Sequence, residues 1–62
     1  MTILEKGLAL QALIYEARVS EQLRCAAAHA DMPEAIQLLG HSEQHDKVVR
    51  SMMNAILDER AA

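Results

Sequence analysis

The chain has 62 residues, a formal net charge of −3 and a single cysteine, Cys25. A chain of this length forms one domain at most and buries only about 60% of the surface that it exposes when unfolded. Because a lone cysteine excludes an intramolecular disulfide, we expect either a metal ion or a second polypeptide to stabilise the fold.

Composition predicts an all-α fold, formed as a single domain over residues 1–62. Hydrophobic residues make up 52% of the chain, but there is one aromatic residue, and strong helix formers dominate the rest. The excess of acidic over basic residues argues against nucleic acid, because phosphate neutralisation supplies most non-specific affinity for it. No stretch reads as a signal peptide or a bilayer-spanning helix, so we expect a cytoplasmic protein without membrane contact.

Two helix starts are visible in the sequence. Thr2 followed by Glu5 has the form of a capping box, and Asp31 followed by Glu34 repeats it, with Pro33 in the first turn where its missing N–H is tolerated. These signals predict one helix over about 2–29 and another over about 32–60. A tight turn at 29–31 would join them into an antiparallel two-helix hairpin.

The first predicted helix carries apolar residues on two sides. At 100° per residue, one set forms a stripe that we expect to be the core of the hairpin. The stripe comprises Leu4, Leu8, Ala12, Tyr15, Val19, Leu23, Ala26 and Ala30. A second set lies on the other side, namely Ile3, Leu10, Leu13, Ile14 and Ala17. Since one neighbouring helix covers only one side, we expect a second chain to cover the other, as in a dimeric four-helix bundle.

The second predicted helix has a seven-residue rhythm suited to antiparallel, coiled-coil-like packing. Its stripe comprises Leu38, Ser42, His45, Val49, Met52 and Ile56, widened by His41, Val48 and Met53. Gly40 weakens this helix by about 1 kcal/mol relative to alanine. The sequence leaves open whether the helix runs through Gly40, kinks there, or splits.

His41 and His45 are the candidate metal-binding or pH-sensitive residues. Their i,i+4 spacing suits one helical face, but zinc needs three or four ligands. Cys25 and His29 would extend the set only if the chain bent sharply at Gly40. The alternative is that His45 lies in a seam, hydrogen-bonded across an interface, with His41 at its edge. Because burial among apolar neighbours disfavours the charged form of a histidine, acidification toward pH 5 would then weaken association.

A catalytic role is not expected. A hydrolase based on Ser42, His45 and Asp46 would lack an oxyanion loop and a water-excluding pocket, and nothing identifiable lowers the pKa of Cys25.

The sequence therefore predicts a non-catalytic protein–protein interaction module that needs no cofactor. Its partner would be a second copy of the chain, a helix of another protein, or both. The expected interface comprises Leu10, Leu13, Ile14, Ala17, Val48, Met52, Met53 and Ile56. A nucleic-acid-binding regulator and a metal-binding helical module remain the alternatives.

Two families of small bacterial helical hairpins resemble this chain. Its opening residues 1–5 (MTILE), its length and its two-helix plan resemble the co-chaperones of type III secretion needle subunits, which are cytoplasmic hairpins that help to hold a needle protein unpolymerised. This resemblance implies a chaperone-like function.

The second family is that of the plasmid copy-number regulator Rop, whose hairpins pair into a four-helix bundle that binds RNA loop pairs. Met1-Thr2, Glu5-Lys6, Asp46 and Arg50-Ser51 resemble it at similar chain positions. Where that family has its RNA-contacting Asn, Phe, Gln and Lys, this chain has Leu10, Ile14, Arg18 and Cys25. The resemblance therefore implies the bundle but not the binding of RNA.

Overall fold

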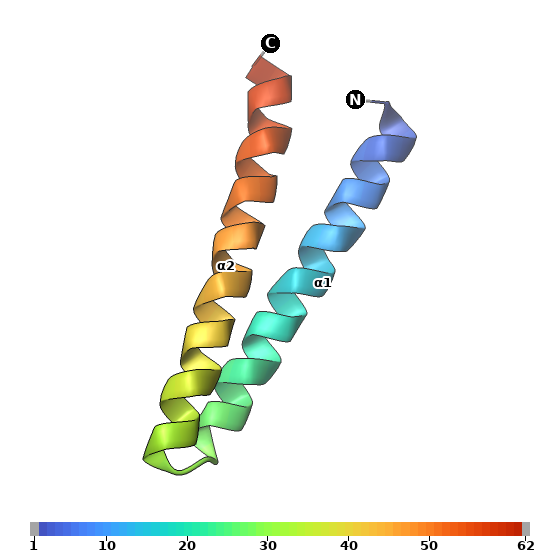
Figure 1. Cartoon of the computed structure of the whole chain (residues 1–62). Helices are drawn as coiled ribbons and strands as arrows, with labels where there is room; N and C mark the ends of the chain where they lie inside the picture. Colours follow the sequence, from blue (N-terminus) through green and yellow to red (C-terminus); the bar gives the residue numbers. More distant parts are fainter. Residues whose placement is uncertain (1, 62) are drawn as a thin grey trace.

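The chain folds into a hairpin of two long helices (Figure 1). The computed structural model describes residues 2–61, and side chains over residues 2–58. Helix α1 spans Ile3–Ala28 and helix α2 spans Met32–Ala61, and a short turn joins them. The start of α1 and the end of α2 lie at the same end of the hairpin, opposite the turn. The prediction of an all-α antiparallel hairpin is confirmed, with helices close to the expected ranges of about 2–29 and 32–60.

Both helix starts are capped by the residues that the sequence indicated. The Glu5 N–H donates to Thr2 Oγ1 at 3.1 Å, and the Thr2 hydroxyl donates to the Glu5 carboxylate at 3.2 Å. At α2, the Glu34 N–H donates to Asp31 Oδ1 at 3.4 Å. Each side chain therefore satisfies an amide that the first helical turn leaves without a backbone partner.

Helix α2 is continuous through Gly40, so the structure shows no break there. A Cβ atom added at Gly40 would meet no other atom within 4 Å, which indicates that the glycine does not serve a close contact. Within the described part of the chain, neither helix has the length and hydropathy needed to cross a membrane.

A single seam of buried and half-buried residues joins the two helices. Its members recur at alternating spacings of three and four, the pattern of an antiparallel coiled coil. They are Ala9, Leu13, Glu16, Ser20, Leu23 and Ala27 on α1, and Ala35, Leu38, Ser42, His45, Val49, Met52 and Ile56 on α2. The stripe predicted for the second helix is the α2 part of this seam.

The core stripe predicted for the first helix is wrong except at Leu23, which belongs to the seam. Leu4, Leu8 and Tyr15 are 74%, 58% and 67% exposed. Over most of α1, the seam residue is the next one along the chain from the predicted one, which corresponds to a rotation of about 100°. The prediction placed the most apolar side inward, whereas the seam includes Glu16 and Ser20, whose polar groups find partners on α2.

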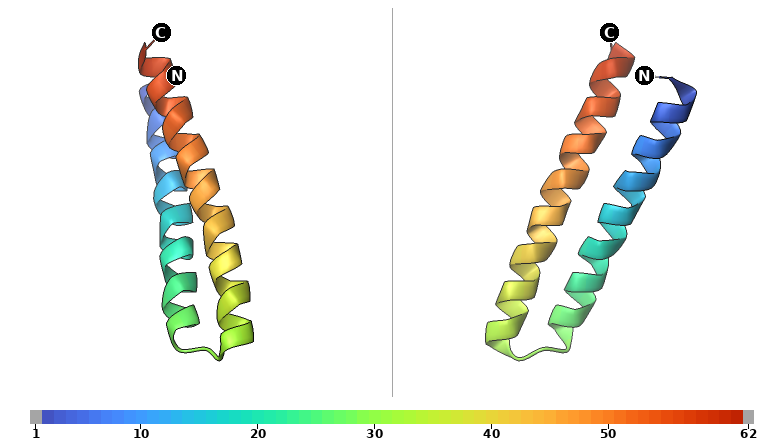
Figure 2. Two further views of the ribbon diagram at one scale, coloured as in Figure 1. Left: turned by 90° about the vertical axis from the view of Figure 1, so that its left-hand side faces the viewer. Right: turned by 45° about the vertical axis from the view of Figure 1, so that its right-hand side comes forward.

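The hairpin buries very little apolar surface by itself. Among the described residues, Ala27 is the only buried hydrophobic one, and the two fully buried side chains are Ser20 and Ser42. The helices lie close at the turn and diverge toward the termini, as Figure 1 and the right-hand view of Figure 2 show. The two-helix unit thus lacks the hydrophobic core that a domain of this size normally needs.

Candidate interaction surface

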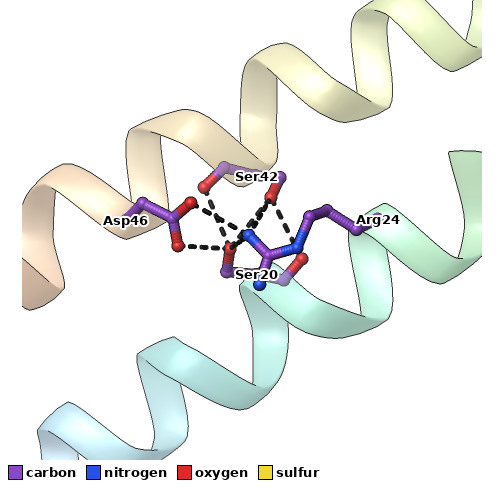
Figure 3. A network of polar contacts seen from close by, with 4 residues as sticks. All are labelled: Ser20, Arg24, Ser42 and Asp46. Atoms are coloured by element: carbon purple, nitrogen blue, oxygen red, sulfur yellow. Dashed lines mark hydrogen bonds and ion pairs between the residues drawn. The ribbon is translucent and has the colours of Figure 1, made fainter.

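The middle of the seam is held by a polar network of Ser20, Arg24, Ser42 and Asp46 (Figure 3). The Ser20 hydroxyl lies 2.6 Å from Asp46 Oδ1, the shortest of its contacts, so its one proton is donated to this carboxylate. The Ser42 hydroxyl donates to the Ser20 carbonyl oxygen at 3.1 Å. These bonds tie α1 to α2 at one level and fix the register of the hairpin.

Arg24 completes the network from the side of the seam. Its Nη1 donates to Asp46 Oδ2 at 3.0 Å and to Ser20 Oγ at 3.0 Å. No buried side-chain nitrogen or oxygen in the described residues lacks a hydrogen-bond partner. A polar centre that is fully satisfied in this way avoids the free-energy cost of buried unpaired groups.

The network also stabilises the ionised form of Asp46. The hydrogen bond from Ser20 lowers the pKa of Asp46 below its usual value, and the positive charge of Arg24 acts in the same direction against the opposing effect of partial burial. Asp46 is therefore a carboxylate at neutral pH and accepts from both partners.

A second polar contact lies next to this network. His45 Nδ1 contacts Glu16 Oε2 across the seam, with both side chains half-buried. His45 therefore lies in the seam with a polar partner across it, as expected. Its neighbours are not only apolar, because the Glu16 carboxylate is among them.

The structure does not bring the candidate metal ligands together. His29, His41 and Cys25 are exposed, and His45 contacts Glu16. Within the described residues, no three His, Cys, Asp or Glu side chains are grouped so as to hold a metal ion. The pair His41 and His45 thus offers at most two ligands, fewer than a zinc site uses.

The hydrolase arrangement is also not formed. Ser42 is 2% exposed, and its hydroxyl donates to a backbone carbonyl oxygen. The His45 ring contacts Glu16 instead of activating Ser42. In this position Ser42 joins the helices and is not accessible to a substrate.

The seam divides the rest of the hairpin surface into two sides. Arg24 and Asp46 contact each other beside the seam, and residues seven apart along each helix share a side. This side, named the Arg24 side, contains Ile3, Leu10, Ala17 and Arg24 of α1 and Met32, Leu39, Asp46 and Met53 of α2. The residues four positions further along each helix lie beside them, namely Gly7, Ile14, Glu21 and Ala28 of α1 and Ile36, Glu43, Arg50 and Leu57 of α2. The opposite one, named the Val19 side, contains Ala12, Val19, Ala26, His41, Val48 and Ala55.

Large exposed apolar residues gather on the Arg24 side. Twelve such side chains in the described part of the chain are at least 42% exposed. Eight of them lie on the Arg24 side, namely Ile3, Leu10, Ile14, Met32, Ile36, Leu39, Met53 and Leu57. The Val19 side has Leu8, Tyr15 and Val48, and Leu4 faces away from the seam. These exposed apolar residues make the Arg24 side the candidate interaction surface of the hairpin.

The residues predicted for the interface fall into three groups. Leu10, Ile14 and Met53 are exposed on the Arg24 side. Leu13, Ala17, Met52 and Ile56 are half-buried in or beside the seam, where they contribute to the hairpin itself. Val48 is 42% exposed on the opposite side.

Sequence reasoning missed the polar network and the apolar residues near the turn. The signal for the network was present, because Ser20 and Ser42 occupy seam positions that would otherwise hold apolar residues. Met32, Ile36 and Leu39 follow the three-and-four spacing of residues that share one side of a helix. The same spacing continues to Met53 only through charged residues such as Asp46, so a count of apolar residues alone does not reveal it.

No protein-family model, curated protein or solved structure matches the chain. These comparisons therefore give no support to the two resemblances noted in the sequence, and a proposal of function rests on the exposed surfaces of the hairpin.

Proposed function

We propose that this chain is a non-catalytic interaction protein whose hairpin is completed by another helical polypeptide. The observation that carries the proposal is the contrast between its exposed and buried apolar residues. Leu10, Ile14 and ten other large apolar side chains are exposed, while Ala27 is the only buried hydrophobic residue of the described chain.

The physical reason is that a folded state of this size needs more apolar burial than the hairpin provides. Covering an apolar surface releases about 25 cal/mol for each Å² removed from water. A helix packed along the hairpin would remove several exposed leucine, isoleucine and methionine side chains from water together. Association thus supplies the stabilisation that the two helices lack by themselves.

Neither alternative function has an observation of comparable weight. The net charge is −3, because nine acidic residues outnumber six basic ones, and this balance opposes the binding of phosphate groups. Among the residues that the structure describes, the two spaced histidines are not joined by further ligands. We therefore propose neither a nucleic-acid-binding nor a metal-binding role.

Light scattering and thermal unfolding of the purified full chain test the proposal. We expect either a molar mass above the 6.9 kDa of one chain, with a melting temperature that rises with concentration, or a poorly folded monomer that lacks its partner. A monomer at micromolar concentration that is fully helical, melts cooperatively and has a concentration-independent melting temperature would refute the proposal.

A further inference from the structure

Along the Arg24 side, from the termini to the turn, apolar and charged residues follow an order that favours one particular binding partner. Its apolar residues lie at the two ends of the hairpin. The termini patch contains Ile3, Leu10, Ile14, Met53 and Leu57, and the turn patch contains Met32, Ile36 and Leu39. Between them lies a charged band of both signs, formed by Glu21, Arg24, Glu43, Asp46 and Arg50.

We infer that a second copy of this chain covers the Arg24 side, turned end to end, so that two hairpins form an antiparallel four-helix bundle. This inference rests on the proposed function and names the partner and the face. In a two-fold symmetric interface the same surface meets itself. A rotation of 180° about an axis through the middle of the Arg24 side places the termini patch of each copy on the turn patch of the other.

The charged band fits the same rotation. Asp46 lies near the middle of α2, with Arg50 on the side of the termini and Glu43 on the side of the turn. End-to-end rotation therefore brings Arg50 of one copy near Glu43 of the other, at two symmetric places. Each Asp46 retains its own Arg24 and does not face its copy as an unpaired charge. Opposite charges placed in this way select the partner and the orientation.

A parallel arrangement of the two copies is disfavoured by the same residues. In a two-fold arrangement with the termini of both copies at one end, α2 of each copy would lie against α1 of the other, so Arg50 and Glu43 would not meet and their attraction would be lost. The order of the band thus distinguishes the two orientations, although both would cover the apolar patches.

The exposed area of the hairpin also matches the needs of a dimer. The chain exposes 4887 Å², whereas a compact monomeric protein of 6.9 kDa exposes about 4,000 Å². The excess of roughly 900 Å² is close to the ~800 Å² that each partner buries in a stable protein–protein interface. One further hairpin on one side is therefore sufficient, and no larger assembly is required.

Two leucines on α1 provide a matched pair of variants for the choice of face. Leu10 belongs to the termini patch and is 43% exposed, whereas Leu8 lies toward the Val19 side and is 58% exposed. In sedimentation equilibrium of the full chain we expect a dimer for the wild type. Leu10→Glu should raise the dimer dissociation constant by at least about tenfold, because it buries an unpaired charge, and Leu8→Glu should change it by less than about twofold.

Leu39→Glu, in the turn patch, is a second variant that should weaken the dimer as much as Leu10→Glu. Circular dichroism at the same concentrations shows whether each variant remains helical. A dimer that Leu8→Glu disrupts and Leu10→Glu does not would overturn the inference while leaving the proposed function intact. A wild-type chain that is a poorly folded monomer would do the same, whereas a robust folded monomer would refute both.

Charge exchange tests the orientation. Glu43→Arg and Arg50→Glu should each weaken the dimer, because each places like charges together at both symmetric positions. An equimolar mixture of the two variants should restore association to the wild-type level, since the mixed dimer pairs opposite charges again. In a parallel dimer, residues 43 and 50 of the two copies would not face each other, so the mixture would associate no more tightly than the two variants alone. That result would overturn the end-to-end arrangement.

Discussion

The half of the hairpin next to the turn and the half next to the termini are built from different seam residues. In the turn half, the seam consists mainly of alanine and serine, with Ala27 and Ser42 buried. In the terminal half it contains Leu13, Val49 and Met52, which are larger and only half-buried. The helices lie close where the seam residues are small and diverge where they are large (Figure 1).

This contrast explains where the polar network lies. A serine hydroxyl donates to the opposite backbone only if the two helices approach closely, as the Ser42 hydroxyl does to the Ser20 carbonyl oxygen. In the terminal half the seam on α1 ends at Ala9, and the large apolar residues beyond it, such as Ile3 and Leu8, are exposed. The turn half thus fixes the register of the hairpin, and the terminal half is where we propose that another chain supplies the missing burial.

The most damaging change to the turn half would be a large side chain at its centre. Ser20 is 0% exposed, so Ser20→Leu has no room unless the helices separate. We expect a loss of roughly 1–3 kcal/mol in the free energy of unfolding, since overpacking of a tight contact costs about this much. Urea unfolding at a fixed protein concentration measures it. Gln22→Leu, at an exposed position of the same helix, is the control and should have little effect. If both variants unfold at the same urea concentration, the two helices do not approach closely at Ser20.

The fold was predictable from the sequence to the level of the hairpin, because capping residues and the rhythm of α2 are local signals. Thr2, Asp31 and the stripe from Leu38 to Ile56 required no knowledge of the partner helix. The face of α1 was not predictable in the same way. It depends on whether Ser20 and Glu16 find polar partners on α2, which is a property of the assembled pair. Counting apolar residues alone selected Leu8 and Tyr15 in place of Ala9 and Glu16.

The candidate interaction surface was predictable only in part, for the same reason. The excess of apolar residues on the first helix indicated that a partner is needed, and Leu10, Ile14 and Met53 are indeed exposed. Once α1 is rotated, however, Leu13 and Ala17 turn toward α2, and Val48 lies on the other side of the hairpin. An error of one residue in the register of the α1 stripe thus reassigns two of the four interface residues predicted on that helix.

Acid should weaken the turn half by a smaller amount. The pKa of Asp46 is lowered in the folded state, chiefly by the hydrogen bond from Ser20 and also by the charge of Arg24. The stabilisation is therefore fully present above the unfolded pKa of about 3.9. It is lost as the pH falls through the lower folded pKa, because the carboxylate becomes protonated. Because Asp46 is partly exposed, solvent screens the interaction, and the effect should remain below that of Ser20→Leu.

Thermal unfolding between pH 6 and pH 2.5 measures this dependence. The melting temperature of the wild type should fall more across that range than that of Asp46→Asn, which has no carboxylate to protonate at this position. Parallel curves for the two proteins would show that the network does not depend on the charge of Asp46.

The smallest effect compares one glycine in each half of the hairpin. Gly40 lies in the turn half of α2 and Gly7 in the terminal half of α1, and a Cβ atom at either position would meet nothing within 4 Å. Gly40→Ala should therefore raise the free energy of unfolding by up to about 1 kcal/mol, the difference in helix propensity. Gly7→Ala should raise it by less, because Gly7 lies within two turns of the start of α1 at Ile3, where a helix frays and propensity counts less. Urea unfolding of both variants at low concentration, where the chains are separate, checks the order. Equal gains would mean that the terminal half of the isolated hairpin is as firmly helical as the turn half, and that its exposed apolar residues do not weaken it.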